Sequence, residues 1–143
     1  MAVVKADGYG HGAETVARAA LQGGATSLGV ATLQEGLELR RAGLEAPVLL
    51  LSNLNEPDDL RTCLHWRLMP TLSSLRDAQL CNALAADSGR CFDVQLKIDT
   101  GMARLGCSLS EGHQTAAELE SLEHLNLEGI YSHLACADEP NDA

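Results

Sequence analysis

Short apolar runs alternate with amphipathic segments along most of the chain. The runs are rich in Val, Ile and Leu and predict strands at residues 2–5, 27–31, 48–51, 67–71, 92–98 and 127–133. Between them, apolar residues recur at helical spacing, as at Val16, Ala19 and Ala20. Gly24 and Gly43 stand where two of these helices are expected to end. Six strands alternating with five helices predict an α/β fold whose parallel strands are joined by right-handed crossovers.

Two architectures arrange parallel strands in this way, an open doubly wound sheet and a closed (β/α)8 barrel. The repeat from strand to strand is about 24 residues, whereas a complete barrel takes about 250 residues. The 143 residues therefore hold about six of the eight strands of a barrel. We expect residues 1–143 to form one domain, an incomplete (β/α)8 TIM-like barrel, and to be a fragment of a longer polypeptide.

The amino-acid composition argues against some classes of binding partner and site. Lys and Arg number 10 against 20 Asp and Glu, a formal net charge of −10 at pH 7, so binding to nucleic acid or to a membrane surface is not expected. The cysteines are irregularly spaced and include no CxxC pair, so the sequence signals neither a disulfide framework nor a metal centre. No apolar run reaches the roughly 20 residues of a membrane span, and no signal peptide is recognisable. We expect a cytoplasmic protein.

The chain has only two lysines, and both stand at predicted carboxyl ends of strands, where functional groups of parallel α/β folds collect. Lys5 is followed by ADGYGHG, residues 6–12, whose glycines let the backbone approach a ligand. This segment has the spacing of neither a phosphate loop nor a dinucleotide fingerprint. Desolvation at a strand end favours the neutral amine, the form that condenses with an aldehyde. Lys5 is therefore a candidate nucleophile; the alternative is a lysine that only extends into solvent at the barrel rim.

The second lysine, Lys97, begins the segment KIDTGMARLG, residues 97–106. Alternation along the preceding strand places its apolar residues toward the helices and Lys97 toward the barrel interior. Arg104 follows nearby, and two cations in one pocket repel each other unless an anion lies between them. Because an isolated buried ammonium is costly, Lys97 needs an anionic partner. That partner is either a bound anion or, in a purely structural ion pair, Asp93 or Asp99.

A third candidate segment is GIYSHLACAD, residues 129–138. His133 stands at the predicted end of the last strand, where it could stack on a planar ligand, transfer a proton or simply end the strand. Tyr131 has the same parity along the strand, so both side chains are expected on one face.

Together these three strand ends resemble the N-terminal barrel of alanine racemases, fold-type III enzymes that depend on pyridoxal 5'-phosphate. VKADGYGHG (residues 4–12) resembles the cofactor-lysine signature of that family, DTGMARLG (99–106) its substrate loop, and SHLACAD (132–138) a third block. The resemblance implies that Lys5 holds the cofactor covalently and serves as a catalytic base. It also implies that Tyr9 contacts the cofactor phosphate and that His133 lies against the pyridine ring.

The resemblance extends to substrate binding. Arg104 would hydrogen-bond the phenolic oxygen of the cofactor and help to orient the substrate carboxylate, with the backbone amide of Met102 assisting. Lys97 matches a lysine that some members carry as a carbamate, which would supply the missing anion beside Arg104. Ala103 departs from the family pattern, because a glycine is more usual at this position.

By the same resemblance, the parent protein would interconvert L-alanine and D-alanine with two opposed bases, act as a homodimer and supply D-alanine for peptidoglycan. In the family the second base is a tyrosine from the C-terminal β domain of the partner subunit, which lies beyond this sequence. The fragment alone is therefore expected to be inactive. Two alternatives stay open: a noncatalytic barrel that carries pyridoxal phosphate, and a plain α/β binding module in which the lysines form structural ion pairs.

Overall fold

Aliphatic side chains on short extended segments build the core. In the computed structural model, which describes residues 1–138, Leu28, Val30, Val48 and Leu50 are completely buried under the helices. Burial of such side chains, about 1.5–3 kcal/mol each relative to exposure, is what draws the amphipathic helices onto the sheet.

Among the described residues, seven strands and six helices are formed. The strands are β1 (Ala2–Val3), β2 (Leu28–Val30), β3 (Val48–Asn53), β4 (Met69–Leu72), β5 (Phe92–Asp99), β6 (Cys107–Ser108) and β7 (Leu125–Ser132). The helices are α1 (Lys5–Gly10), α2 (Ala13–Gln22), α3 (Leu33–Arg41), α4 (Pro57–His65), α5 (Leu75–Asp87) and α6 (Leu109–Glu120).

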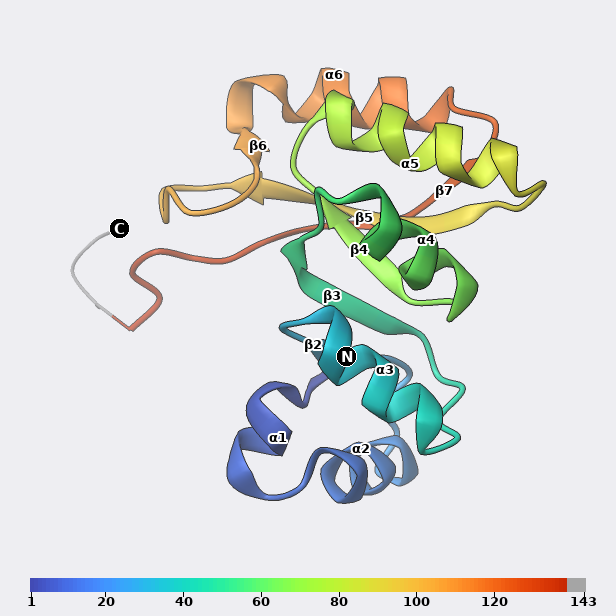
Figure 1. Cartoon of the computed structure of the whole chain (residues 1–143). Coiled ribbons are helices and arrows are strands. Elements are labelled where there is room, and N and C mark those ends of the chain that lie inside the picture. Colours follow the sequence, from blue (N-terminus) through green and yellow to red (C-terminus); the bar gives the residue numbers. More distant parts are fainter. Residues whose placement is uncertain (139–143) are drawn as a thin grey trace.

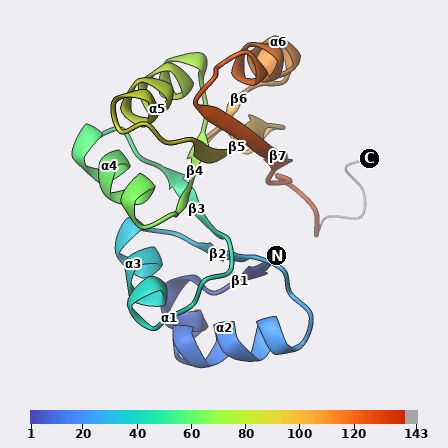
Figure 2. The same cartoon turned by 90° about the vertical axis from the view of Figure 1, so that its right-hand side faces the viewer.

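All strand pairs are parallel, and the order β1-β2-β3-β4-β5 follows the chain. Beyond β4, β5 pairs with both the short β6 and the long β7, in the register Lys97 opposite Tyr131 for the latter. The sheet curves, with the helices on its convex side, so that β1 and β7 form its two free ends (Figures 1 and 2). This is the predicted incomplete barrel.

The six predicted strands are confirmed within a few residues, and two elements were not predicted. Strand β6 is only two residues long, too short to leave a pattern in the sequence. Helix α1 replaces the expected loop after the first strand, so Lys5 begins this turn and does not end β1. Similarly, His133 follows β7 and is not part of it.

Local sequence signals set the helix boundaries. Thr32 caps α3 in a complete capping box with Glu35, and Ser74 and Ser108 accept hydrogen bonds from the third residues of α5 and α6. Gly24 and Gly43, which follow α2 and α3, have φ values of 100° and 78°, a backbone conformation that glycine adopts without penalty. Across residues 1–138, none of the helices has both the length and the apolar character needed to cross a membrane.

The core makes one stability prediction. Phe92 on β5 is the largest fully buried side chain, so Phe92→Ala should lower the free energy of unfolding by about 3–5 kcal/mol. Leu109→Ala is the control, because Leu109 is 72% exposed and its loss should matter by about 0.5 kcal/mol or less. Urea denaturation measures both; equal losses in the two variants would contradict the assigned core.

Candidate active site

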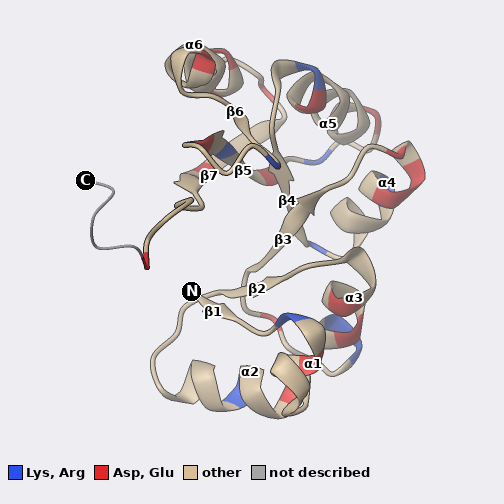
Figure 3. Cartoon of the chain, turned by 90° about the vertical axis from the view of Figure 1, so that its left-hand side faces the viewer, with Lys and Arg blue, Asp and Glu red and all other residues tan. Residues whose placement is uncertain are grey.

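Three polar segments follow the carboxyl ends of β1, β5 and β7. Because the strands are parallel, these ends lie along one edge of the sheet, here called the carboxyl edge. Figure 3 views the molecule from this side, with α1 near the bottom and the ends of β5 and β7 above it.

Directly after Lys5 the backbone makes one turn of left-handed helix. Four consecutive residues, Ala6 to Tyr9, have φ values of 51–62° and ψ values of 37–51°. Such a conformation costs about 1–2 kcal/mol for each residue other than glycine, and only Gly8 in this turn lacks a Cβ. Backbone strain of this kind persists only where the surrounding structure holds it, and it concentrates at functional sites.

Hydrogen bonds from both sides hold this turn. Gly8 N–H donates to the carbonyl of Val4 at 2.9 Å, and the carboxylate of Asp7 accepts from Ala13 N–H, the first residue of α2, at 2.7 Å. Ala6 N–H donates to Glu35 Oε1 at 2.8 Å, which ties the turn to the start of α3. The turn leaves Lys5 half-buried and Tyr9 60% exposed.

Lys97 lies inside the curve of the sheet and is only 5% exposed. Its Nζ lies 5.6 Å from the centroid of the Tyr131 ring, close enough for a cation–π interaction. The Tyr131 hydroxyl is 2.7 Å from Thr71 Oγ1, which in turn donates to the carbonyl of Leu50 at 2.7 Å. Because the single Thr71 proton is used toward Leu50, Tyr131 is the donor to Thr71.

Lys97 forms neither of the two structural ion pairs that the sequence left open. Within residues 1–138 it has no carboxylate within salt-bridge distance; Asp93 accepts from the Asn126 side chain instead. Burial, and then the nearby Arg104 charge, lower the pKa of the Lys97 amine, and Asp99 opposes them only in part. The purely structural pairing of Lys97 with Asp93 or Asp99 is therefore wrong for the described structure, and the need for an anion remains.

The carboxylate of Asp99 organises the loop that carries Arg104. Its Oδ1 accepts from Gly101 N–H and Ala103 N–H, both at 3.0 Å. The amide of Ala103, followed by that of Gly101, holds the pKa of the Asp99 carboxyl below its usual value, and the Met102 amide adds to the effect. The Met102 amide thus faces Asp99, and Ala103 has a φ of 54°, where the family glycine would be unstrained.

The loop is also packed closely against its own strand. A Cβ at Gly106 would lie 2.6 Å from the Asp99 nitrogen, so only glycine fits there. The hydroxyls of Thr100 and Ser132, 2.6 Å apart, join this loop to the end of β7. Arg104 and His133 are both exposed at this end of the sheet.

The structure brings the predicted residues to one edge but in two groups. Lys97, Arg104, Met102 and His133 belong to the adjacent strands β5 and β7 and the segments after them. Lys5 and Tyr9 follow β1, at the other free end of the sheet. Within residues 1–138, Lys5 makes neither a hydrogen bond nor an ion pair with the first group.

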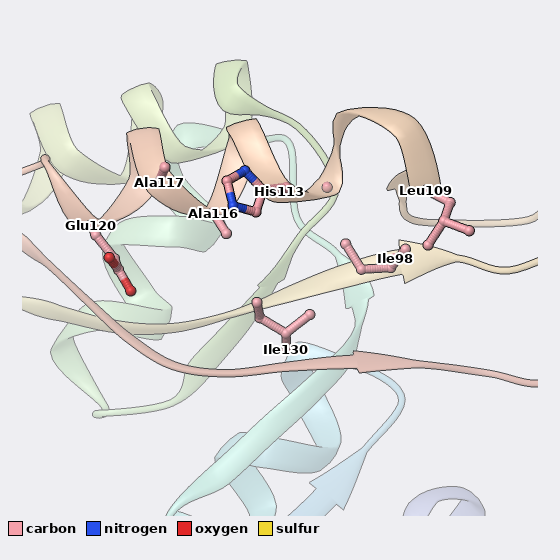
Figure 4. Close-up of a pocket in the computed structure, with 8 residues that line it drawn as sticks. Ile98, Leu109, His113, Ala116, Ala117, Glu120 and Ile130 are labelled. Atoms are coloured by element: carbon pink, nitrogen blue, oxygen red, sulfur yellow. The ribbon is translucent and has the colours of Figure 1, made fainter.

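A groove of about 480 Å³ lies elsewhere, between α6 and the outer face of β5 and β7 (Figure 4). Ile98, Ile130 and Ala116 point into it, and its lining includes neither lysine nor arginine. Most of the residues that line the groove are apolar. It is not part of the candidate active site at the carboxyl edge.

Comparison with known proteins shows which family the chain belongs to. Residues 1–143 match the model of the family described as alanine racemase, N-terminal domain. The chain belongs to this family. The alanine racemase of Prochlorococcus marinus is 62% identical over 138 residues, which cover 96% of this chain and 36% of that protein. The alanine racemase of Synechocystis sp. is 52% identical over 143 residues, 100% of this chain and 38% of that protein.

Solved structures of the family share the fold. Alanine racemase of Clostridium difficile in complex with cycloserine superposes with a TM-score of 0.90 at 38% identity, over 96% of this chain and 38% of that one. A histidine racemase of Leuconostoc mesenteroides gives a TM-score of 0.87 at 30% identity, over 99% of this chain and 38% of that one. The chain therefore spans little more than a third of the length of these relatives.

The residues at the carboxyl edge fit pyridoxal phosphate by their chemistry. A primary amine at Lys5 suits its aldehyde, and the imidazole of His133 suits its planar ring. The buried Lys97 amine and the exposed Arg104 guanidinium, which form no salt bridge among the described residues, suit an anionic ligand. At Gly10, a Cβ would meet no atom within 4 Å, so open space lies beside the turn that carries Lys5.

Sequence analysis missed several residues that shape this site. Glu35 was not singled out, although the pattern Thr32-x-x-Glu35 is a recognisable capping box. Nothing in the sequence indicated the bonds of Thr71 or the contact between Thr100 and Ser132, because these partners lie more than 20 residues apart.

The buried amine predicts a pH effect. Burial lowers the pKa of Lys97 in the folded protein below its ordinary value of 10.5. Between the folded-state and the unfolded-state pKa, the unfolded chain therefore binds more protons than the folded chain. The free energy of unfolding consequently rises with pH across this interval. Lys97→Met should therefore be more stable than the unmodified protein at pH 7, and the difference should shrink toward pH 10. Urea denaturation in CO2-free buffer measures it; a difference independent of pH would contradict the desolvated amine.

Proposed function

We propose that this chain is the cofactor-binding part of a longer pyridoxal-phosphate-dependent racemase that interconverts L-alanine and D-alanine. The observation that carries the proposal is the family match over residues 1–143, with a lysine placed on a strained turn at the carboxyl edge. The strain matters because a side chain on a rigidly held turn is preorganised for chemistry.

Lys5 is the catalytic residue in this proposal. Its amine would hold the cofactor covalently and, as the free amine, would remove or return the Cα proton of the substrate on one face. When bound, pyridoxal phosphate delocalises the negative charge left at Cα. Inversion needs a second base on the opposite face, since a single base would mostly return the proton to the face it came from. This base comes from outside the chain, and in the proposed homodimer the partner subunit supplies it.

The other groups at the carboxyl edge bind and orient. Tyr9, on the turn after Lys5, would contact the cofactor phosphate, and His133 would lie against the pyridine ring. Arg104 would hydrogen-bond the phenolic oxygen and orient the substrate carboxylate, assisted by the Met102 amide. Tyr9 is 60% exposed, which leaves its side chain available to a ligand.

The substrate in this proposal is alanine, because the curated relatives reported above are named alanine racemases. The likeness to a histidine racemase makes histidine the competing substrate to assay. Cytoplasmic supply of D-alanine for peptidoglycan is the corresponding physiological role. A noncatalytic carrier of pyridoxal phosphate is the second candidate, which the substrate loop at 99–106 disfavours.

Replacing the amine tests the proposal. In the full-length protein, Lys5→Ala should lower kcat by at least about 10³-fold, as expected when a covalent catalyst is removed, while circular dichroism stays unchanged. Racemisation is followed with D-amino-acid oxidase. Arg18→Ala is the control, because Arg18 pairs with Glu14 on the surface of α2.

Borohydride reduction in the presence of pyridoxal phosphate should fix the cofactor on Lys5, as located by peptide mass spectrometry. Label on another residue would contradict the assignment. Label on Lys5 without racemisation of alanine or histidine would support the carrier.

The lowered pKa of Lys97 supports a second proposal, that its amine forms a carbamate, since only a neutral amine attacks carbon dioxide. The carbamate would place a negative charge beside Arg104. With 13C-bicarbonate, the full-length protein should show a carbamate carbon signal in NMR spectra, which Lys97→Arg should lack. A signal that persists in this variant would assign the carbamate elsewhere.

A further inference from the structure

Glu35 joins two strand ends that are far apart in the sequence. It lies at the third position of α3, after β2, and its carboxylate is reached by three backbone N–H groups. Oε2 accepts from Ala31 at 2.7 Å and from Thr32 at 3.1 Å, and Oε1 accepts from Ala6 at 2.8 Å. The bonds to Oε2 belong to the start of its own helix, but the bond to Ala6 crosses 29 residues to the turn after β1.

The N–H of Ala6 belongs to the peptide group between Lys5 and Ala6. Fixing this peptide plane sets ψ of Lys5 and the positive φ of Ala6, 51°. The direction of the Lys5 Cα–Cβ bond is thereby set relative to α3, which the sheet holds rigidly. Without the bond, relaxation of the left-handed turn would carry the Lys5 side chain away from its present direction.

We propose that Glu35 is a positioning residue that holds the Lys5–Ala6 peptide and so aims the Lys5 amine. The proposal rests on the function assigned above to Lys5. It goes beyond helix capping, because a capping box needs the Glu35 carboxylate only at Thr32 N–H.

The chemistry of the side chain is specific. Three N–H donors converge on two oxygens, and a carboxylate can accept all three. A glutamine has one accepting oxygen and an NH2 group that cannot accept. Its oxygen is expected to stay with the two N–H groups at the start of its own helix, so the bond to Ala6 is the one that is lost. An aspartate is shorter by one methylene, about 1.5 Å, and cannot span both.

The first experiment needs no variant. Amide hydrogen exchange by NMR should show Ala6 N–H protected in the full-length protein, although the residue is exposed and its acceptor is a side chain. Protection should fall at least about tenfold in Glu35→Gln. Exchange of Ala6 as fast as in an unfolded peptide would overturn the proposal.

The second experiment separates positioning from helix capping. Glu35→Gln should lower kcat about 10- to 100-fold, the cost of misplacing a reacting group by an ångström or less, while KM for alanine changes less than threefold. It should also slow borohydride-trappable loading of pyridoxal phosphate on Lys5.

Thr32→Ala is the matched control, since it removes the other half of the capping box but leaves the carboxylate in place. It should lower Tm by a few degrees and leave kcat and the loading rate within twofold. Equal effects of the two variants on kcat would mean that Glu35 acts only as a helix cap, which would overturn the proposal. If Glu35→Gln fails to fold, Glu35→Asp takes its place with the same expectations.

Failure of the proposed function has a different signature. In that case the unmodified protein itself would not load pyridoxal phosphate on Lys5, whereas Ala6 exchange would still report whether Glu35 holds the peptide. Loading on Lys5 with an unprotected Ala6 would overturn the positioning role alone.

Discussion

Parallel pairing of the strands is the constraint on which the rest of the structure depends. It sends the carboxyl end of each strand to one edge, so segments as distant in sequence as 5–12 and 132–138 follow strands that end along the same edge. The helices on the convex side bury the aliphatic faces and leave the concave side to polar groups such as Lys97, Thr71 and Tyr131. The aliphatic core and the polar groups thus lie on opposite faces of one sheet.

The carboxyl edge contains locally unfavourable features that the core lacks. The left-handed turn and the buried Lys97 amine without a salt bridge are each unfavourable by themselves. Carboxylates offset part of this cost: those of Asp7 and Glu35 hold the turn, and that of Asp99 holds the following loop. These acidic groups bind backbone amides and leave the cations free, which preserves positive charge for an anionic ligand.

The opening between β1 and β7 explains why the candidate active site is divided. The lysine that would hold the cofactor follows one free end of the sheet, and the groups that would bind its ring and the substrate follow the other. The relatives, of which this chain covers 36–38%, have the length to close such a sheet.

The sequence by itself determined the α/β class, six of the strands, the incomplete barrel and the family, because apolar periodicity and the order of three motifs are local properties of the chain. It placed Lys97 in the interior by the same reasoning. Only the tertiary structure decided that Asp93 and Asp99 bind other donors and form no salt bridge with Lys97. It also decided that Ala6 to Tyr9 wind left-handed and that Glu35 reaches Ala6. These features depend on contacts between residues brought together by strand pairing. The Ala6 amide and the Glu35 carboxylate, for example, are 29 residues apart, and a contact over that distance produces no periodic pattern in the sequence.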